Sequence, residues 1–387
     1  MVAAAFTASF VVFGVMYSFG VFFTPMATEF HASHAATSAF FSITGFVSYL
    51  LASVTGHLSD RFGPRIVVGA GAVVMGTGLV FTAFIGHMWV GYLTYGVGVG
   101  VGAACAYIPT LAIVGGWFTK GRNTALGIAA TGTGCGTLLT PPVAAAFIQR
   151  YGWRATDIFF GIGAAALLSA CAAVARLPPI AAHLVTRRPL GRVVRSAEFA
   201  MLYVSWLFAT TALLVPFVFV PSYARNHGAN EVAAASLLSV IGGVGTVSRL
   251  GIGVLADRMG TVGLFKTAVF VMGASYTIWL VSPAYGWLIV FAAILGLGYG
   301  ARISLMPAVL IEFFGLQNLG GLLGIFFTAS GFSAVLGPPV AGLIVDYTGS
   351  YRWGIGYALA MGLLGFATIA RLHERTDEQN RVTAIAN

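Results

Sequence analysis

Two arginines lie in the middle of apolar segments, where a charged side chain needs a reason to be. Arg249 is set in GTVSRLGIGV (245–254), and Arg302 in LGYGARISLM (297–306). A guanidinium is planar and always charged, so it can hold a carboxylate through two parallel hydrogen bonds. Because an arginine at the bilayer centre costs about 3 kcal/mol, we expect both side chains to face water or a binding partner.

The chain offers few acidic partners for these two arginines. Every carboxylate that could approach them falls near the end of an apolar segment: Glu29, Asp60, Asp157, Glu198, Glu231, Asp257, Glu312 and Asp346. Two interior cations without interior anions indicate that the substrate brings the negative charge. The alternatives are that Arg249 binds backbone carbonyls or reaches Asp257, and that Arg302 is structural.

Three tyrosines also fall in the middle third of apolar segments and could donate to a bound carboxylate. They are Tyr17, Tyr107 and Tyr299. Interior tyrosines also serve simply as packing residues, and that alternative stays open for each. All seven histidines fall at or near segment ends, so none is predicted to carry a proton at mid-depth.

The composition indicates an integral membrane protein. Hydrophobic residues make up 58% of the 387 residues and charged residues only 8%, against roughly a quarter in soluble domains. The net charge of +9 does not indicate nucleic-acid binding, because the basic residues are scattered at segment ends. The three cysteines have no metal-binding spacing, and no nucleophile–base constellation indicates an enzyme, so we expect no metal and no cofactor.

The apolar segments predict an all-α protein with twelve transmembrane helices. A helix needs about 20 residues to cross the hydrocarbon core. Lys and Arg favour one side, since only Arg150, Arg154, Arg225 and Arg352 fall on the other, and the positive-inside rule then places both termini in the cytoplasm. The predicted spans are 4–28, 36–58, 65–87, 90–117, 123–148, 154–176, 197–222, 232–256, 262–283, 286–312, 320–345 and 353–371.

An internal repeat divides these spans into two bundles of six. GHLSDRFG (56–63) returns as GVLADRMG (253–260), and PPVA (141–144) returns at 338–341, both 197 positions later. An even number of spans gives the two copies the same orientation. The predicted organisation is a bundle of residues 1–176, a cytoplasmic linker 177–196, a second bundle 197–373 and a cytoplasmic tail 374–387.

The motif GHLSDRFGPR (56–65) resembles the loop signature of the major facilitator superfamily. In that resemblance Asp60, Arg61 and Arg65, with Asp257 and Arg258 in the second copy, are gating residues. A carboxylate beside helix ends can accept backbone N–H groups or pair with an arginine. A solvated charged loop that only sets the topology is the alternative.

WFTKGRNTALGIAATG (117–132) resembles the fifth-span signature of the monocarboxylate transporter family, and SRLGIGVLAD (248–257) resembles its eighth span. The resemblance implies a bacterial member that moves lactate- or pyruvate-like anions with a proton, and it puts Arg249 where the family binds the substrate carboxylate. Two positions depart from the animal members: Tyr17 aligns with a lysine, and Gly245 with an aspartate.

We therefore predict a secondary transporter of small monocarboxylates in a bacterial cytoplasmic membrane. The predicted partners are the anion, a proton and membrane lipid, but not nucleic acid, and the sequence does not indicate an accessory subunit. An oxalate/formate-type exchanger, which would grip a dianion with two cations, is the main alternative. A membrane enzyme or a non-transporting sensor on the same scaffold are further ones.

Overall fold

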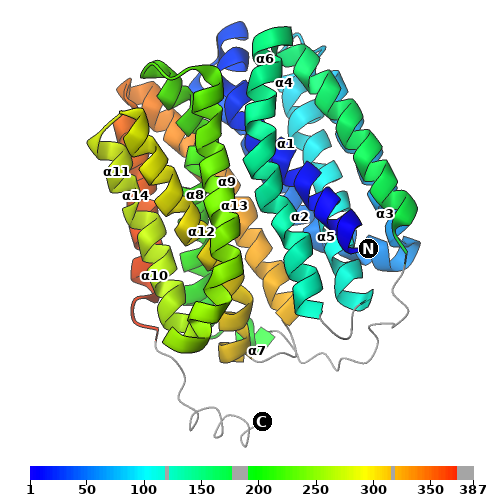
Figure 1. Ribbon diagram of the computed structural model, residues 1–387, viewed down its shortest axis with the longest axis vertical. Coiled ribbons are helices and arrows are strands. Elements are labelled where there is room, and N and C mark those ends of the chain that lie inside the picture. The colour runs from blue at the N-terminus through cyan, green and yellow to red at the C-terminus, as the bar shows by residue number, and fades with distance from the viewer. Residues whose placement is uncertain (118–121, 177–190, 315–318, 373–387) are drawn as a thin grey trace, which may run out of the picture.

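The computed structural model describes residues 1–117, 122–176, 191–314 and 319–372, and this part of the chain is helical without strands. Figure 1 shows long helices running roughly side by side. The first six spans, coloured blue to green, form one side of the bundle, and the later ones, green to red, form the other.

The first half contains six membrane crossings. They are formed by α1 (Val2–Glu29), α2 (His34–Phe62), α3 (Pro64–Thr82), a composite of α4 (Met88–Gly91), the π-helix η1 (Tyr92–Val99) and α5 (Gly100–Trp117), and the two arms of α6 (Arg122–Val174). The arms of α6 meet at Gly152, whose φ of 80° breaks the helix.

The second half repeats this pattern after the short α7 (Gly191–Val194). Its crossings are α8 (Ala197–Asn226), α9 (Glu231–Met259), α10 (Thr261–Ala274) with α11 (Tyr276–Val281), α12 (Tyr285–Phe314), α13 (Leu319–Thr348) and α14 (Tyr351–Ile369). The predicted twelve-helix, two-bundle fold is confirmed. Among the described residues, ten stretches are long and apolar enough to cross a membrane, and one of them contains both arms of α6.

The backbone repeats with the same offset as the sequence motifs. All six described residues with positive φ form three pairs, each 197 positions apart: His31 with Gly228, Gly63 with Gly260, and Gly152 with Gly349. Each pair lies at the same turn of the two halves. A left-handed residue turns the chain sharply, and glycine adopts it without steric cost, so the two halves share their turns as well as their helices.

The two halves meet along two seams, α2 against α13 and the first arm of α6 against α9. Small residues make the second seam tight: Gly134 faces Thr246, and Gly242 faces Thr137. α1 and α8 also cross between the halves. Large apolar side chains such as Phe84 remain exposed on the outside of the bundle, which suits a surface that faces lipid.

Candidate functional site

Arg249 lies on α9 and points toward α12. Its guanidinium carbon is 5.0 Å from the centre of the Tyr299 ring. Its Nε is buried and has no hydrogen-bond partner. No ion pair to a carboxylate of the described side chains involves either Arg249 or Arg302. The cation is therefore held by an aromatic face, and its Nε is left without an acceptor.

Glycines bring α9 and α12 close enough for this contact. A Cβ on Gly300 would overlap the backbone of Gly245, and a Cβ on Gly245 would lie 3.2 Å from the Tyr299 ring. Such a Cβ contact is tight, and neighbouring atoms would have to shift. The position at which animal members of the resembling family carry an aspartate thus faces the aromatic ring that contacts Arg249.

Arg302 lies on α12, one helical turn after Tyr299, and only 1% of its surface is exposed. Its guanidinium carbon is 4.1 Å from the centre of the Trp206 ring, and Nη2 donates to Thr210 Oγ1 at 3.0 Å. Nε and Nη1 have no partner. Buried donors normally find acceptors, so this guanidinium retains unused capacity to bind an anion.

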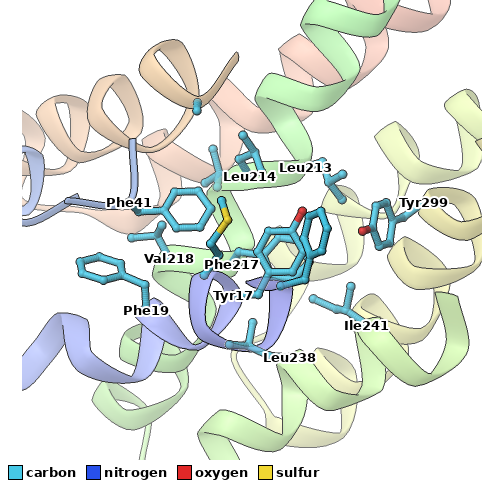
Figure 2. Packing of buried hydrophobic residues seen from close by; sticks show 14 of the residues in the cluster. Tyr17, Phe19, Phe41, Leu213, Leu214, Phe217, Val218, Leu238, Ile241 and Tyr299 are labelled. Carbon is cyan, nitrogen blue, oxygen red and sulfur yellow. The ribbon is translucent and has the colours of Figure 1, made fainter. Parts of the chain in front are cut away.

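Tyr17 and Tyr299 lie on opposite halves and are joined through Phe217 of α8. The Tyr17 ring stacks on Phe217 with centroids 4.1 Å apart, and Phe217 meets Tyr299 edge to face at 6.2 Å. Figure 2 shows the stacked rings of Tyr17 and Phe217, with Phe41 on one side and Tyr299 on the other. Both tyrosine side chains are about 3% exposed. Tyr17 therefore contributes to the closure between the halves as well as to the polar region.

Tyr107 of α5 lies within electrostatic range of Arg249, and its ring packs edge-on against Phe13 at 4.8 Å. The structure adds Tyr49 of α2, which the sequence reasoning missed. Tyr49 lies within range of the Tyr17 hydroxyl and of Arg302, and its ring stacks on Phe327 of α13 at 5.9 Å. Nothing in the sequence distinguishes Tyr49 from the other 13 tyrosines.

A small pocket lies beside these tyrosines in the first half. Tyr49, Tyr107 and Ser48 give it polar groups, and Phe13 and Ala52 are among its apolar lining. Of the predicted substrate residues, only Tyr107 lines this pocket. The others are connected outside it: Arg249 contacts Tyr299, and Arg302 lies within electrostatic range of Tyr17 and Tyr299.

The predicted gating residues lie at the ends of helices, away from this region. Arg61 and Arg65 are exposed, and the Arg61 guanidinium lies 5.2 Å from the Phe62 ring centre. The helices reach Asp60, Asp257 and Arg258, but those three side chains lie outside the described part of the structure. Their gating role stays a prediction.

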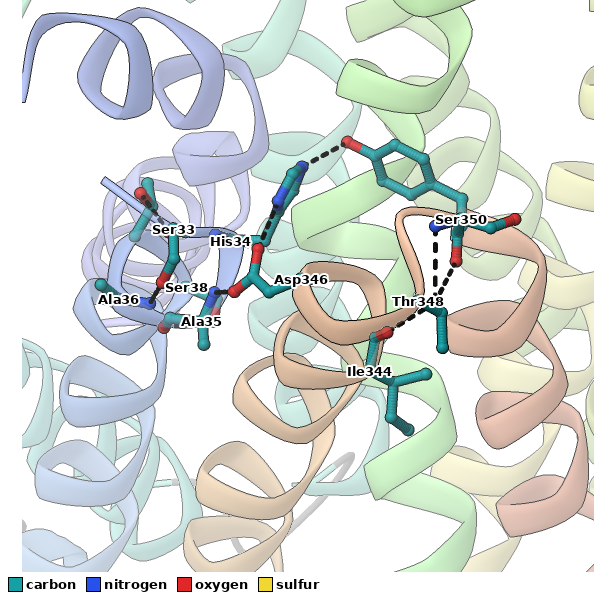
Figure 3. Close-up of polar contacts among 11 residues, drawn as sticks. Ser33, His34, Ala35, Ala36, Ser38, Ile344, Asp346, Thr348 and Ser350 are labelled. Atoms are coloured by element: carbon teal, nitrogen blue, oxygen red, sulfur yellow. Dashed lines mark hydrogen bonds and ion pairs between the residues drawn. The ribbon is translucent and has the colours of Figure 1, made fainter. Parts of the chain in front are cut away.

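The opposite end of the bundle carries a polar link between the halves that the sequence did not predict. Asp346 of α13 accepts the backbone N–H groups of His34 and Ala35 at 2.9 Å each, and its Oδ1 is 2.7 Å from His34 Nδ1. Tyr351 lies 3.0 Å from the other ring nitrogen. Figure 3 shows the imidazole between the carboxylate and the phenol. We call His34, Ala35, Asp346 and Tyr351 the latch.

The comparisons with known proteins agree with this architecture. The sequence matches the Major Facilitator Superfamily profile over residues 5–280 and 252–385. Monocarboxylate transporter 3 of Rattus norvegicus is 30% identical over 364 residues, covering 89% of this chain and 74% of its own length. This chain belongs to the monocarboxylate transporter family. Monocarboxylate transporter 12 of Xenopus laevis is 28% identical over 386 residues, with 90% of this chain and 84% of that protein covered.

Solved transporters share the fold of this monocarboxylate transporter family member. A bacterial homologue of the human lysosomal transporter Spinster, in an inward-facing and occupied conformation, has a TM-score of 0.82 at 14% identity, covering 97% of this chain and 98% of that one. A POT family transporter in complex with 5-aminolevulinic acid gives 0.77 at 12% identity, covering 95% and 94%. The chain is an integral multi-pass membrane transporter, not an enzyme, and the predicted family is confirmed.

Proposed function

We propose that this transporter moves small monocarboxylates, lactate- or pyruvate-like, together with a proton. The observation that carries the proposal is Arg249, a cation between the two halves with a free Nε and no ion pair to a described carboxylate. A monocarboxylate matches the guanidinium fork in charge and shape. The names of the relatives support the same substrate class.

In this mechanism the carboxylate first pairs with Arg249, while Tyr107, Tyr299, Tyr17 and Arg302 offer further donors nearby. Pairing neutralises a cation that is costly to keep in a low dielectric. The loaded site is then nearly charge-balanced, and the halves rock around it more readily than around an empty site. The bundles 1–176 and 197–373 are the proposed moving bodies, joined by the linker 177–196.

We place the latch end of the bundle outside, with both termini and the tail 374–387 in the cytoplasm of a bacterial inner membrane. In that orientation the structure is closed to the outside, because the latch links the halves at that end and the Tyr17–Phe217 stack links them at the centre. The gating residues Asp60, Arg61, Arg65, Asp257 and Arg258 would then act on the cytoplasmic side, latching it when the site faces outward.

An oxalate/formate-type anion exchanger remains the second candidate. Arg302 favours it, because its Nε and Nη1 lack partners and a second interior cation would suit a dianion. Counterflow separates the two: liposomes preloaded with unlabelled oxalate should not accelerate labelled lactate uptake if the substrate is a monocarboxylate.

The direct test is uptake into proteoliposomes with an imposed pH gradient. Labelled lactate, pyruvate, formate and oxalate are compared at equal concentration, while an internal dye reports the internal pH. Monocarboxylate uptake with internal acidification is the expected result for symport. Arg249→Ala should abolish that uptake, whereas the exposed Arg150→Ala should not. Wild-type uptake by Arg249→Ala would refute the assignment of the site.

A further inference from the structure

Asp157 is a fully buried carboxyl group without a hydrogen-bond partner. It lies five positions after Gly152, in the second arm of α6, with 1% of its surface exposed, and neither Oδ1 nor Oδ2 has a partner. Asp157 falls near a segment end, as the sequence indicates, but its side chain is buried, which position along the chain does not reveal. An ionised carboxylate without partners in a protein interior costs several kcal/mol. The neutral, protonated acid avoids most of that cost.

The charged groups around Asp157 do not compensate it. Arg154 lies within electrostatic range of Asp157, but its fork is already used. It donates to Glu29 Oε1 at 3.1 Å and 2.7 Å and to the carbonyls of Ala83 and Ile85 at 2.6 Å and 2.9 Å. Glu29 in turn accepts from Trp153. The arginine therefore serves a separate network at the helix end.

The other helices packed on this arm of α6 present no paired counter-charge to Asp157. From η1, the Tyr95 hydroxyl faces it within electrostatic range; Tyr95 is 2% exposed and its OH also lacks a partner. α1 brings Glu29, already paired with Arg154, and the tyrosine of the central region, Tyr17. The only ionisable side chain of α3 is Arg65, exposed at the far end of that helix. No metal-binding group of His, Cys, Asp and Glu occurs among the described residues.

We propose that Asp157 is a proton-binding site of the transporter, occupied while the latch end is closed. This inference rests on the proposed proton-coupled transport and identifies a group that carries the proton. The ligand is a single proton, delivered from the external solution when the latch end is open. Closure then buries the neutral acid, and an ionised Asp157 opposes closure because it cannot be buried at acceptable cost.

Packing contacts link Asp157 to the surface between the halves. The ring of Tyr95 packs against those of Phe19 and Phe40, with ring centroids 5.5 Å and 6.1 Å apart. Phe19 contacts Phe23 at 6.4 Å, and Phe23 meets Phe219 of the second half at 5.2 Å. Parting the halves at the latch end separates Phe23 from Phe219 and loosens this aromatic layer. Water would then gain a route toward the carboxyl, and the proton could exchange.

The experiment combines infrared spectroscopy with flux. Purified full-length protein at pH 7 is expected to show the carbonyl band of a protonated carboxylic acid, shifted in D₂O, and Asp157→Asn should lose that band. Glu231→Gln is the control, because the Glu231 carboxyl has a cationic partner: its Oε1 lies 3.2 Å from Nη2 of Arg225. A wild-type spectrum without the band, or an unchanged band in Asp157→Asn, overturns the proposal whether or not the protein transports lactate.

In proteoliposomes, one coupled proton changes the closed population by up to about tenfold per pH unit. Wild-type uptake should fall steeply as the external pH rises, whereas Asp157→Asn should vary less than about twofold over the same range. A wild-type pH profile in Asp157→Asn overturns the coupling role. If the band disappears as expected but no tested monocarboxylate is moved by the wild type, the proposed function fails and the proton site stands.

Discussion

Replacing Arg249 by lysine separates the charge of the site from its shape. Lysine keeps a positive charge at this position but has neither the planar fork nor the extended face that lies 5.0 Å from the Tyr299 ring centre. The substitution therefore removes one of the two parallel hydrogen bonds that Arg249 would donate to the proposed carboxylate, and it weakens the aromatic contact. Arg249→Ala removes these and the charge as well.

The expected loss of affinity follows from the hydrogen bond, because the Tyr299 contact is already present without substrate. A hydrogen bond between charged groups contributes about 1.5–3 kcal/mol, which corresponds to substrate binding roughly 13- to 160-fold weaker. The folded state should be almost unchanged, because Arg249 forms no ion pair with a described side chain that lysine would break.

The assay is lactate binding to the purified variants by calorimetry, with uptake and melting temperature measured on the same preparations. Arg150→Lys is the matched control: the Arg150 guanidinium also faces a tyrosine, with 5.5 Å to the Tyr151 ring centre, but on the exposed surface. Binding by Arg249→Lys within about threefold of wild type would show that the fork is not used. An equal loss in Arg150→Lys would show that the effect is not specific to the site.

Two further substitutions test contacts around the site. Asp346→Asn should weaken the latch to His34 by about 1–3 kcal/mol and lower the melting temperature by several degrees. Glu231→Gln is the control and should lower the melting temperature less, because the ion pair of Glu231 lies within one half. Equal shifts would contradict a latch between the halves. Thr210→Val should lower the free energy of unfolding by about 1–3 kcal/mol, because Arg302 Nη2 loses its acceptor. Thr211→Val should lower it less, because Thr211 loses only a hydrogen bond to the carbonyl of Leu207 in its own helix. Thermal melting in detergent compares the two variants.

The fold was predictable because it depends on local properties of the sequence. Span length, charge placement and the 197-residue offset give twelve helices in two halves, and the break at Gly152 separates the fifth and sixth spans as predicted. The π-helix at Tyr92–Val99 was not predicted. Its apolar sequence is compatible with an ordinary helix, and the wider turn has no signature in residue type.

Residues of the candidate site could be singled out in the sequence where an unusual residue type marks them, but not where packing alone does. Arg249 and Arg302 are visible because a charge in an apolar segment needs an explanation. Asp157 was judged by its distance from a segment end, which does not measure burial. The latch was not predictable either, because His34 and its partner Asp346 are 312 positions apart and no local pattern connects residues so distant.

The duplicated backbone carries an unduplicated charge. The positions related to Arg249 and Arg302 by the 197-residue offset are Ala52 and Cys105, so both guanidinium groups belong to the second half. An anion bound by both guanidinium groups would move together with the second half. The first half would move relative to the bound anion, and it would contribute tyrosine hydroxyls and the small pocket beside them rather than a positive charge. The two halves therefore share a fold but would contribute unequally to binding the substrate.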